Sequence, residues 1–115
     1  MKKVKTHIAT IHLGLRELYG KKIGKVKDVK EICQNFVNAH AGCVSVTPCD
    51  FIYTRGNEPG LRIELINYPR FPSEAKEINA KAIDLAGRLM IRFRQNRITI
   101  TTSDGTFMLE NETLT

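Results

Sequence analysis

The sequence has few cysteines, no long apolar run and few acidic residues near its N-terminus. Its three cysteines, at positions 33, 43 and 49, cannot all pair within one chain, which favours a reduced intracellular protein. No apolar run approaches the roughly 18 to 20 residues that a membrane-spanning helix needs. The basic start is not followed by the apolar stretch and cleavage site of a secretory signal. We therefore expect a soluble, cytoplasmic protein with no membrane segment.

Recognisable catalytic motifs are also missing. The chain has no Gly-x-Ser-x-Gly elbow, no phosphate-binding loop and no nucleotide-binding glycine fingerprint. Cys33 and His40 are seven residues apart, about 10 Å along a helix, which is too far for two ligands of one zinc ion. His7 and His12 do not share a helical face. The sequence therefore predicts no catalytic residue, no metal site and no cofactor, and favours a non-enzymatic protein over an enzyme.

The scarcity of acidic residues in the first thirty positions makes that segment strongly basic. It holds nine Lys or Arg against Glu17 and Asp28, a net charge of +7, whereas residues 31–115 hold nine against ten, a net charge of −1. Such asymmetry favours encounters with anionic partners. One alternative function is therefore a nucleic-acid-associated protein that contacts phosphates through Lys21, Lys22, Lys25 and Lys27. A solvated basic surface is the simpler interpretation, because the spacing does not fit a helix-turn-helix.

The length and composition fit one globular domain over residues 1–115. A chain of 115 residues with 42% hydrophobic and 26% charged residues can bury a core without disulfides. We expect a basic helical segment over 1–42, a sheet with a third helix over 43–110, and a frayed tail over 111–115.

Three segments have helical periodicity. Apolar residues at i, i+3, i+7 and i+10 predict a first helix over 6–20, ended by a glycine. A second helix is expected over 28–41 and a third, the longest, over 73–94. The core stripe of the third helix comprises Ile78, Ala82, Leu85, Leu89 and Phe93.

Two hairpins are expected from period-two alternation and turn residues. Residues 43–54 and 61–66 alternate around the turn formers of 55–60, and we expect Ile52 to lie opposite Ile63. Pro48 requires an edge position or a bulge. In the last hairpin, a turn at Asp104-Gly105 would place Thr102 opposite Phe107 and Ile100 opposite Leu109.

The element order predicted from these patterns is α-α-β-β-α-β-β. Two antiparallel hairpins would form a sheet with the helices packed on one face, which is an α+β fold. We expect the last hairpin, Ile98–Thr102 with Thr106–Glu110, to leave one edge of the sheet open. That edge has no proline and little charge to prevent it from pairing with a second copy of the chain, so we also expect a homodimer.

The richest candidate surface is one face of the first hairpin with its joining loop, 55–60. It mixes aromatic residues with Arg and Glu, the residue types that dominate binding hot spots. We predict a binding or adaptor protein that uses this face for a protein partner or ligand. A second alternative is a small-molecule-binding protein or enzyme with a site at 50–70. The candidate residues are Tyr53, Arg55, Glu58, Arg62, Glu64, Tyr68 and Arg70.

Overall fold

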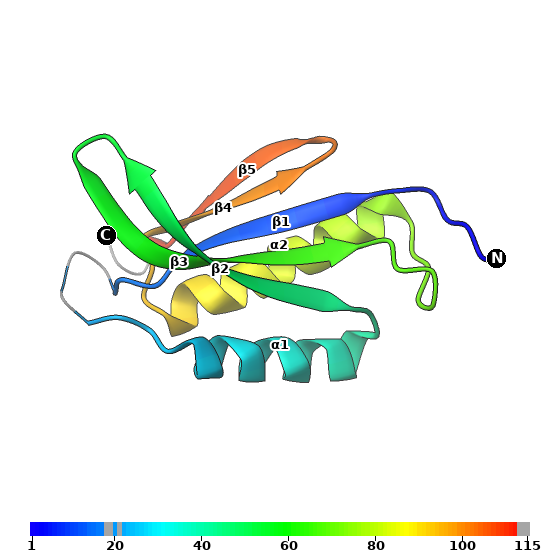
Figure 1. The fold of residues 1–115 in the computed structure, drawn as a ribbon, viewed down its shortest axis with the longest axis horizontal. Coiled ribbons are helices and arrows are strands. Elements are labelled where there is room, and N and C mark those ends of the chain that lie inside the picture. The colour runs from blue at the N-terminus through cyan, green and yellow to red at the C-terminus, as the bar shows by residue number, and fades with distance from the viewer. Residues whose placement is uncertain (18–19, 21, 113–115) are drawn as a thin grey trace.

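In the computed structural model, which describes residues 1–17, 20 and 22–112, five antiparallel strands form one sheet and two helices cover one of its faces (Figure 1). This confirms the predicted α+β fold class. Neither helix of the described chain is long and apolar enough to cross a membrane. The elements, in chain order, are β1 (Ile8–Gly14), α1 (Val26–His40), β2 (Val44–Tyr53), β3 (Gly56–Ile66), α2 (Ala75–Arg92), β4 (Arg97–Thr102) and β5 (Gly105–Glu110).

The first element is a strand, so the helix predicted over 6–20 is wrong. β1 is the central strand of the order β2-β3-β1-β4-β5, and it joins the two hairpins into one sheet. Ala9, Ile11 and Leu13 are fully buried while the residues between them face the other side, which is the period of a strand. Pairing with β3 on one side and β4 on the other satisfies its backbone on both edges. The element order is therefore β-α-β-β-α-β-β, and residues 1–42 are not a purely helical segment.

The core lies between the sheet and the two helices. Ile11 is paired with Ile63 of β3 and with Ile100 of β4, and all three side chains are fully buried. The predicted stripe of the third helix belongs to the same core cluster, since its four residues in α2 and Phe93, which follows the helix, are all buried. α1 adds Val29, Cys33 and Phe36 to the same core. One face of the sheet thus forms the hydrophobic core with α1 and α2. Neither of these helices covers the other face.

The first hairpin turns earlier than expected, at Thr54-Arg55. Tyr53 pairs with Gly56, and Arg55 adopts a left-handed conformation with φ 66°. The predicted loop 55–60 is therefore mostly strand. Ile63 lies opposite Val46 rather than Ile52. β2 is an edge strand, as its proline requires.

The register of the last hairpin differs from the prediction by two residues. Ile98 pairs with Leu109 and Ile100 with Phe107, because the turn is formed by Ser103-Asp104. The amide of Asp104 donates a hydrogen bond to the Thr102 hydroxyl (3.0 Å), which fixes this turn. Because the shift is even, each side chain stays on the face that alternation predicts, with Ile98, Ile100, Phe107 and Leu109 on one face and Thr99, Thr101 and Met108 on the other.

The C-terminal edge of the sheet is β5, which supplies the open edge that the predicted homodimer would use; self-association stays a prediction. Of the predicted tail, Asn111 is buried and its amide donates to the carbonyl of Asn96 (2.8 Å), so fraying does not begin there. Residues 113–115 lie outside the described residues.

Candidate ligand-binding trough

The helix-free face of the sheet carries polar and aromatic side chains from every strand. Both hairpins rise on this side, away from α1 and α2 (Figure 1). Between them, near the end of β1, lies a trough of about 650 Å³. It is lined by His12, Gly14, Phe51, Ile52, Tyr53, Glu58, Gln95, Arg97, Ile98, Thr99 and Met108.

One wall of the trough is aromatic. Phe51 and Tyr53 project from β2, and each ring lies on a glycine of β3. A Cβ atom at Gly60 would overlap the Phe51 ring, and one at Gly56 would overlap the Tyr53 ring. The His12 ring meets Phe51 edge-on, with ring centroids 6.3 Å apart. Glycine at these two positions therefore lets flat rings cover the backbone and present their outer faces to the trough.

A fixed carboxylate lies beside this wall. Glu58 is half-buried, and its Oε2 accepts a hydrogen bond from the backbone amide of Arg16 (3.2 Å). A Cβ atom at Gly14 would lie only 2.6–2.7 Å from the three atoms of this carboxylate. The side chain therefore occupies space that only glycine leaves open, and the Arg16 amide holds it there.

His12 forms part of the floor. Its Nε2 is within hydrogen-bonding distance of the Thr101 hydroxyl (2.9 Å). Burial lowers the pKa of the His12 imidazole, and the positive charge of Arg62 lowers it further. His12 is therefore neutral at pH 7 and adds no positive charge to the floor.

The opposite wall comes from β4 and β5. It contains Arg97, Thr99 and Met108, and the buried amide of Gln95 lies at its base. The Gln95 Nε2 donates to the carbonyl of Arg16 (2.7 Å), which ties this wall to the segment that holds Glu58. The trough thus has an aromatic and anionic wall on one side, and a wall with a cation and a thioether on the other.

The structure brings together only part of the predicted site. Tyr53 and Glu58 line the trough. Arg62 and Glu64 are on the same face but nearer the middle of the sheet, opposite His12 and Thr10 of β1.

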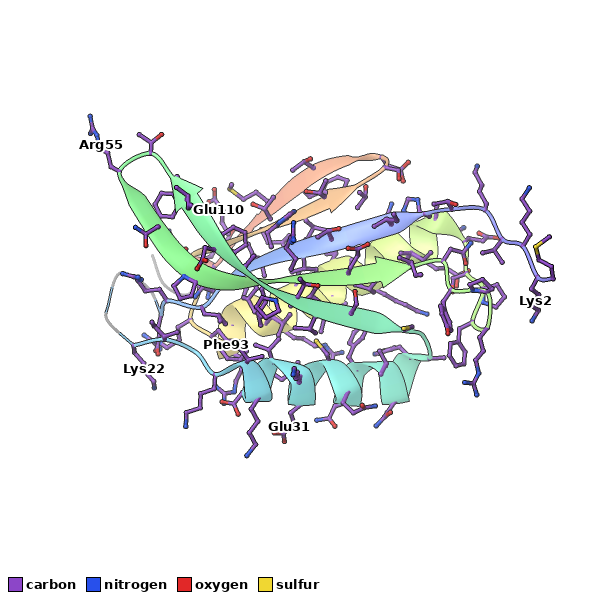
Figure 2. The ribbon with its side chains drawn as sticks, in the orientation of Figure 1. Lys2, Lys22, Glu31, Arg55, Phe93 and Glu110 are labelled. Carbon is purple, nitrogen blue, oxygen red and sulfur yellow. The ribbon has the colours of Figure 1, made fainter. Side chains whose placement is uncertain are left out.

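The other three predicted residues lie elsewhere. Arg55 is at the hairpin tip and points away from the molecule (Figure 2). Tyr68 stacks on Phe71, with centroids 6.1 Å apart, and the Arg70 guanidinium lies 5.4 Å from the centroid of the same ring. This small cluster is in the loop that leads into α2, so it cannot contribute to the trough.

Of the predicted phosphate-binding lysines, Lys22 and Lys25 line one cavity, which they share with the acidic residues Glu17 and Asp28. Lys22 pairs with Glu17 (3.6 Å), Lys25 precedes α1 as its N-cap residue, and Lys27 is exposed on that helix. Lys21 lies outside the described residues.

Sequence reasoning missed His12, Gly14 and Arg97 as site residues. His12 and Gly14 were assigned to a helix, although the alternation of Ala9, Ile11 and Leu13 was a signal for a strand. The strand assignment alone would have placed His12 and Gly14 on the face opposite the core.

The cysteines take no part in the trough. Burial raises the pKa of the Cys33 thiol to about 11, so it stays protonated within the core. Cys43 is exposed and Cys49 is half-buried on β2, and all three are free thiols. Within residues 1–17, 20 and 22–112, no group of three or more His, Cys, Asp and Glu side chains could hold a metal ion.

No protein-family model and no curated protein matches the chain. Its fold is similar to two solved structures of a phage SAM lyase. One is in the apo state, with a TM-score of 0.78 and 17% identity over 92% of this chain and 90% of that chain. The other is in complex with S-methyl-5′-thioadenosine, with a TM-score of 0.71 and 16% identity over 97% of this chain and 96% of that chain.

This likeness corrects the functional prediction. The proteins that share the fold are enzymes, and one of them binds a small molecule. The prediction of a non-enzymatic adaptor with a protein partner is therefore wrong, and so is the alternative of a nucleic-acid partner. The second alternative, a small-molecule site within 50–70, agrees better, although the trough also draws on β1, β4 and β5.

Proposed function

We propose that this protein is an S-adenosylmethionine lyase that binds its substrate in the trough and releases S-methyl-5′-thioadenosine. The observation that carries this proposal is the juxtaposition of an aromatic wall and a fixed carboxylate on the open face of the sheet. The fold likeness to the phage enzymes supports it. The three free cysteines support a cytoplasmic location for this activity.

The groups of the trough match the groups of this ligand. Adenine is flat and aromatic, and it stacks favourably on aromatic side chains such as Phe51 and Tyr53. The sulfonium is a cation, which is attracted to the faces of aromatic rings and to a carboxylate. Glu58 supplies that carboxylate at a position set by Gly14 and the Arg16 amide. A neutral His12 avoids repelling the sulfonium.

The chemistry of the product identifies the bond that is cleaved. S-Methyl-5′-thioadenosine keeps the methyl and adenosyl groups of the substrate, so the bond between sulfur and the methionine chain must break. The electron pair of that bond stays on sulfur, which becomes neutral. The released carbon bonds to an oxygen of the substrate's own carboxylate, so the second product is a lactone and no water is consumed. The transition state thus carries less positive charge on sulfur than the substrate does. Glu58 should therefore contribute mainly to substrate binding rather than to the rate of the bond-breaking step.

The proposal is tested by incubating the purified full chain with S-adenosylmethionine and measuring S-methyl-5′-thioadenosine by liquid chromatography. We expect release of this product well above the rate without protein. Glu58→Gln should raise KM about tenfold with a smaller change in kcat.

The matched control is Glu31→Gln. Glu31 is exposed on α1 and points away from the sheet (Figure 2), so this variant should keep the wild-type KM. No product above background from the wild-type chain would overturn the proposed function. Equal effects of the two substitutions would overturn the role of Glu58.

A further inference from the structure

Arg97 is the only positively charged side chain among the described residues that line the trough. It is exposed at the start of β4, on the same wall as Thr99. The β1–β4 pairing ends at His12 and Thr99, and continuing its antiparallel register by two residues, forward on β1 and back on β4, would place Arg97 opposite Gly14. Glu58 lies against the same Gly14 from the β3 side. A cationic and an anionic side chain thus flank one glycine at the floor of the trough.

Three arginines that precede Arg97 in the sequence are already held in ion pairs. Arg88 pairs with Asp84 (3.0 Å), Arg92 with Asp28 (3.8 Å) and Arg94 with Glu17 (2.8 Å). Arg97 has no such ion pair within residues 1–17, 20 and 22–112, although Glu110 lies opposite it in the β4–β5 register. Its guanidinium is therefore available to an anionic group of a ligand in the trough.

We propose that Arg97 binds the α-carboxylate of the methionine portion of the substrate and so distinguishes S-adenosylmethionine from S-methyl-5′-thioadenosine. This inference rests on the proposed function. A guanidinium suits the task because it can donate two parallel hydrogen bonds to a carboxylate. The product has lost the amino-acid portion, so Arg97 holds the substrate without holding the product. Arg97 is thus a specificity-determining residue, placed opposite the carboxylate that faces the sulfonium.

The experiment uses two stable ligands that differ in the amino-acid portion. S-Adenosylhomocysteine keeps the carboxylate, and its neutral thioether is not an activated leaving group like the sulfonium. S-Methyl-5′-thioadenosine lacks the carboxylate. Calorimetry measures Kd for both ligands with the wild-type chain, Arg97→Gln and Arg97→Lys. The control, Arg55→Gln, removes the same charge at the hairpin tip, outside the trough (Figure 2).

We expect the wild-type chain to bind S-adenosylhomocysteine more tightly than S-methyl-5′-thioadenosine. Arg97→Gln should reduce this preference about tenfold or more and leave the affinity for S-methyl-5′-thioadenosine within about twofold. Arg97→Lys should keep part of the preference, because it keeps the charge without the paired donors. Arg55→Gln should have the same preference between the two ligands as the wild type. The unchanged affinity for the carboxylate-free ligand shows that each variant is folded.

An unchanged preference in Arg97→Gln would overturn this inference, and the proposed function would survive if the wild-type chain still released S-methyl-5′-thioadenosine from S-adenosylmethionine. A wild-type chain that neither binds these ligands nor forms that product would overturn the proposed function, and this inference with it. A preference lost equally in Arg55→Gln would also overturn the assignment, because it would reflect net charge alone.

Discussion

The two faces of the sheet are built from the same strands and differ almost completely in chemistry. On the helix-covered face, Ile11, Ile63 and Ile100 form a row that is fully buried. On the open face, one residue away on each strand, His12 lies beside Arg62 and Thr99. Because side chains alternate along a strand, one short sequence encodes both a stabilising surface and the surface for which we propose ligand binding. Substitutions on the first face should change stability, and those on the second should change binding.

The largest effect is expected from truncating the covered face. Ile63→Ala removes a fully buried side chain from the central row and should lower the free energy of unfolding by about 2–5 kcal/mol. Arg62→Ala, its exposed neighbour, should cost less than about 1 kcal/mol. Urea denaturation of both variants measures this difference. Equal losses of unfolding free energy in the two variants would mean that the open face contributes as much to stability as the covered face.

The next effect concerns the aromatic wall. Tyr53→Ala removes a ring that is 54% exposed, so little stability should be lost. We expect the affinity for S-methyl-5′-thioadenosine to fall about 5- to 150-fold, because stacking on a base contributes about 1–3 kcal/mol. Calorimetry checks this value. The comparison is Tyr68→Ala, which removes a ring outside the trough and should leave the affinity unchanged. An unaffected affinity in Tyr53→Ala would remove this ring from the binding surface.

A smaller effect should follow from a single methyl group on the floor. Gly14→Ala places a Cβ atom within 2.7 Å of the Glu58 carboxylate and should displace it, raising KM for S-adenosylmethionine about tenfold. The double variant Gly14→Ala/Glu58→Asp should have a lower KM than Gly14→Ala alone, because the aspartate side chain is one methylene shorter than glutamate and leaves room for the added methyl group.

The matched control for that substitution is Gly87→Ala in α2. A Cβ atom at Gly87 would meet nothing within 4 Å, and alanine favours a helix over glycine. We expect an unchanged KM and unfolding free energy equal to or slightly above that of the wild type. If both glycine variants had the same KM, the space at Gly14 would not position Glu58.

The smallest effect is the pH dependence contributed by His12. The pKa of His12 is lowered in the folded protein, so the unfolded chain binds its proton first as pH falls below about 6.5. Stability should therefore decrease on acidification through this range, and less so in His12→Gln. Denaturation of both proteins at pH 8 and pH 5 measures the difference. A wild-type chain that gains stability relative to His12→Gln at pH 5 would contradict the sign.

The sequence predicted the local parts of this molecule and failed on the parts that depend on distant pairing. α2 follows from its apolar stripe, and the faces of the last hairpin follow from alternation even though its register is shifted. β1 was mistaken for a helix because Ile8, Ile11 and Leu15 also have helical spacing, and only pairing with β3 and β4 selects the strand.

The same distinction explains the partial prediction of the site. Tyr53 and Glu58 belong to one hairpin, so their neighbourhood was visible in the sequence. Their proximity to Gly14 and Arg97 depends on the insertion of β1 between the two hairpins. Glu58 is about forty residues from Gly14 and about forty from Arg97 in the sequence, so these residues become neighbours only when β1 pairs in the sheet. No local sequence pattern predicts that pairing.

If the open face binds an adenosyl sulfur compound as proposed, the ligand should change the surroundings of the backbone amides that line the trough. The most direct measurement is a titration of the ¹⁵N-labelled chain with S-methyl-5′-thioadenosine, followed by amide chemical shifts. We predict saturable shifts at Gly14, Phe51, Glu58 and Thr99, with the amides of α1 and of the loop at 68–71 unchanged. An absence of saturable shifts, or shifts confined to α1 and that loop, would contradict the account.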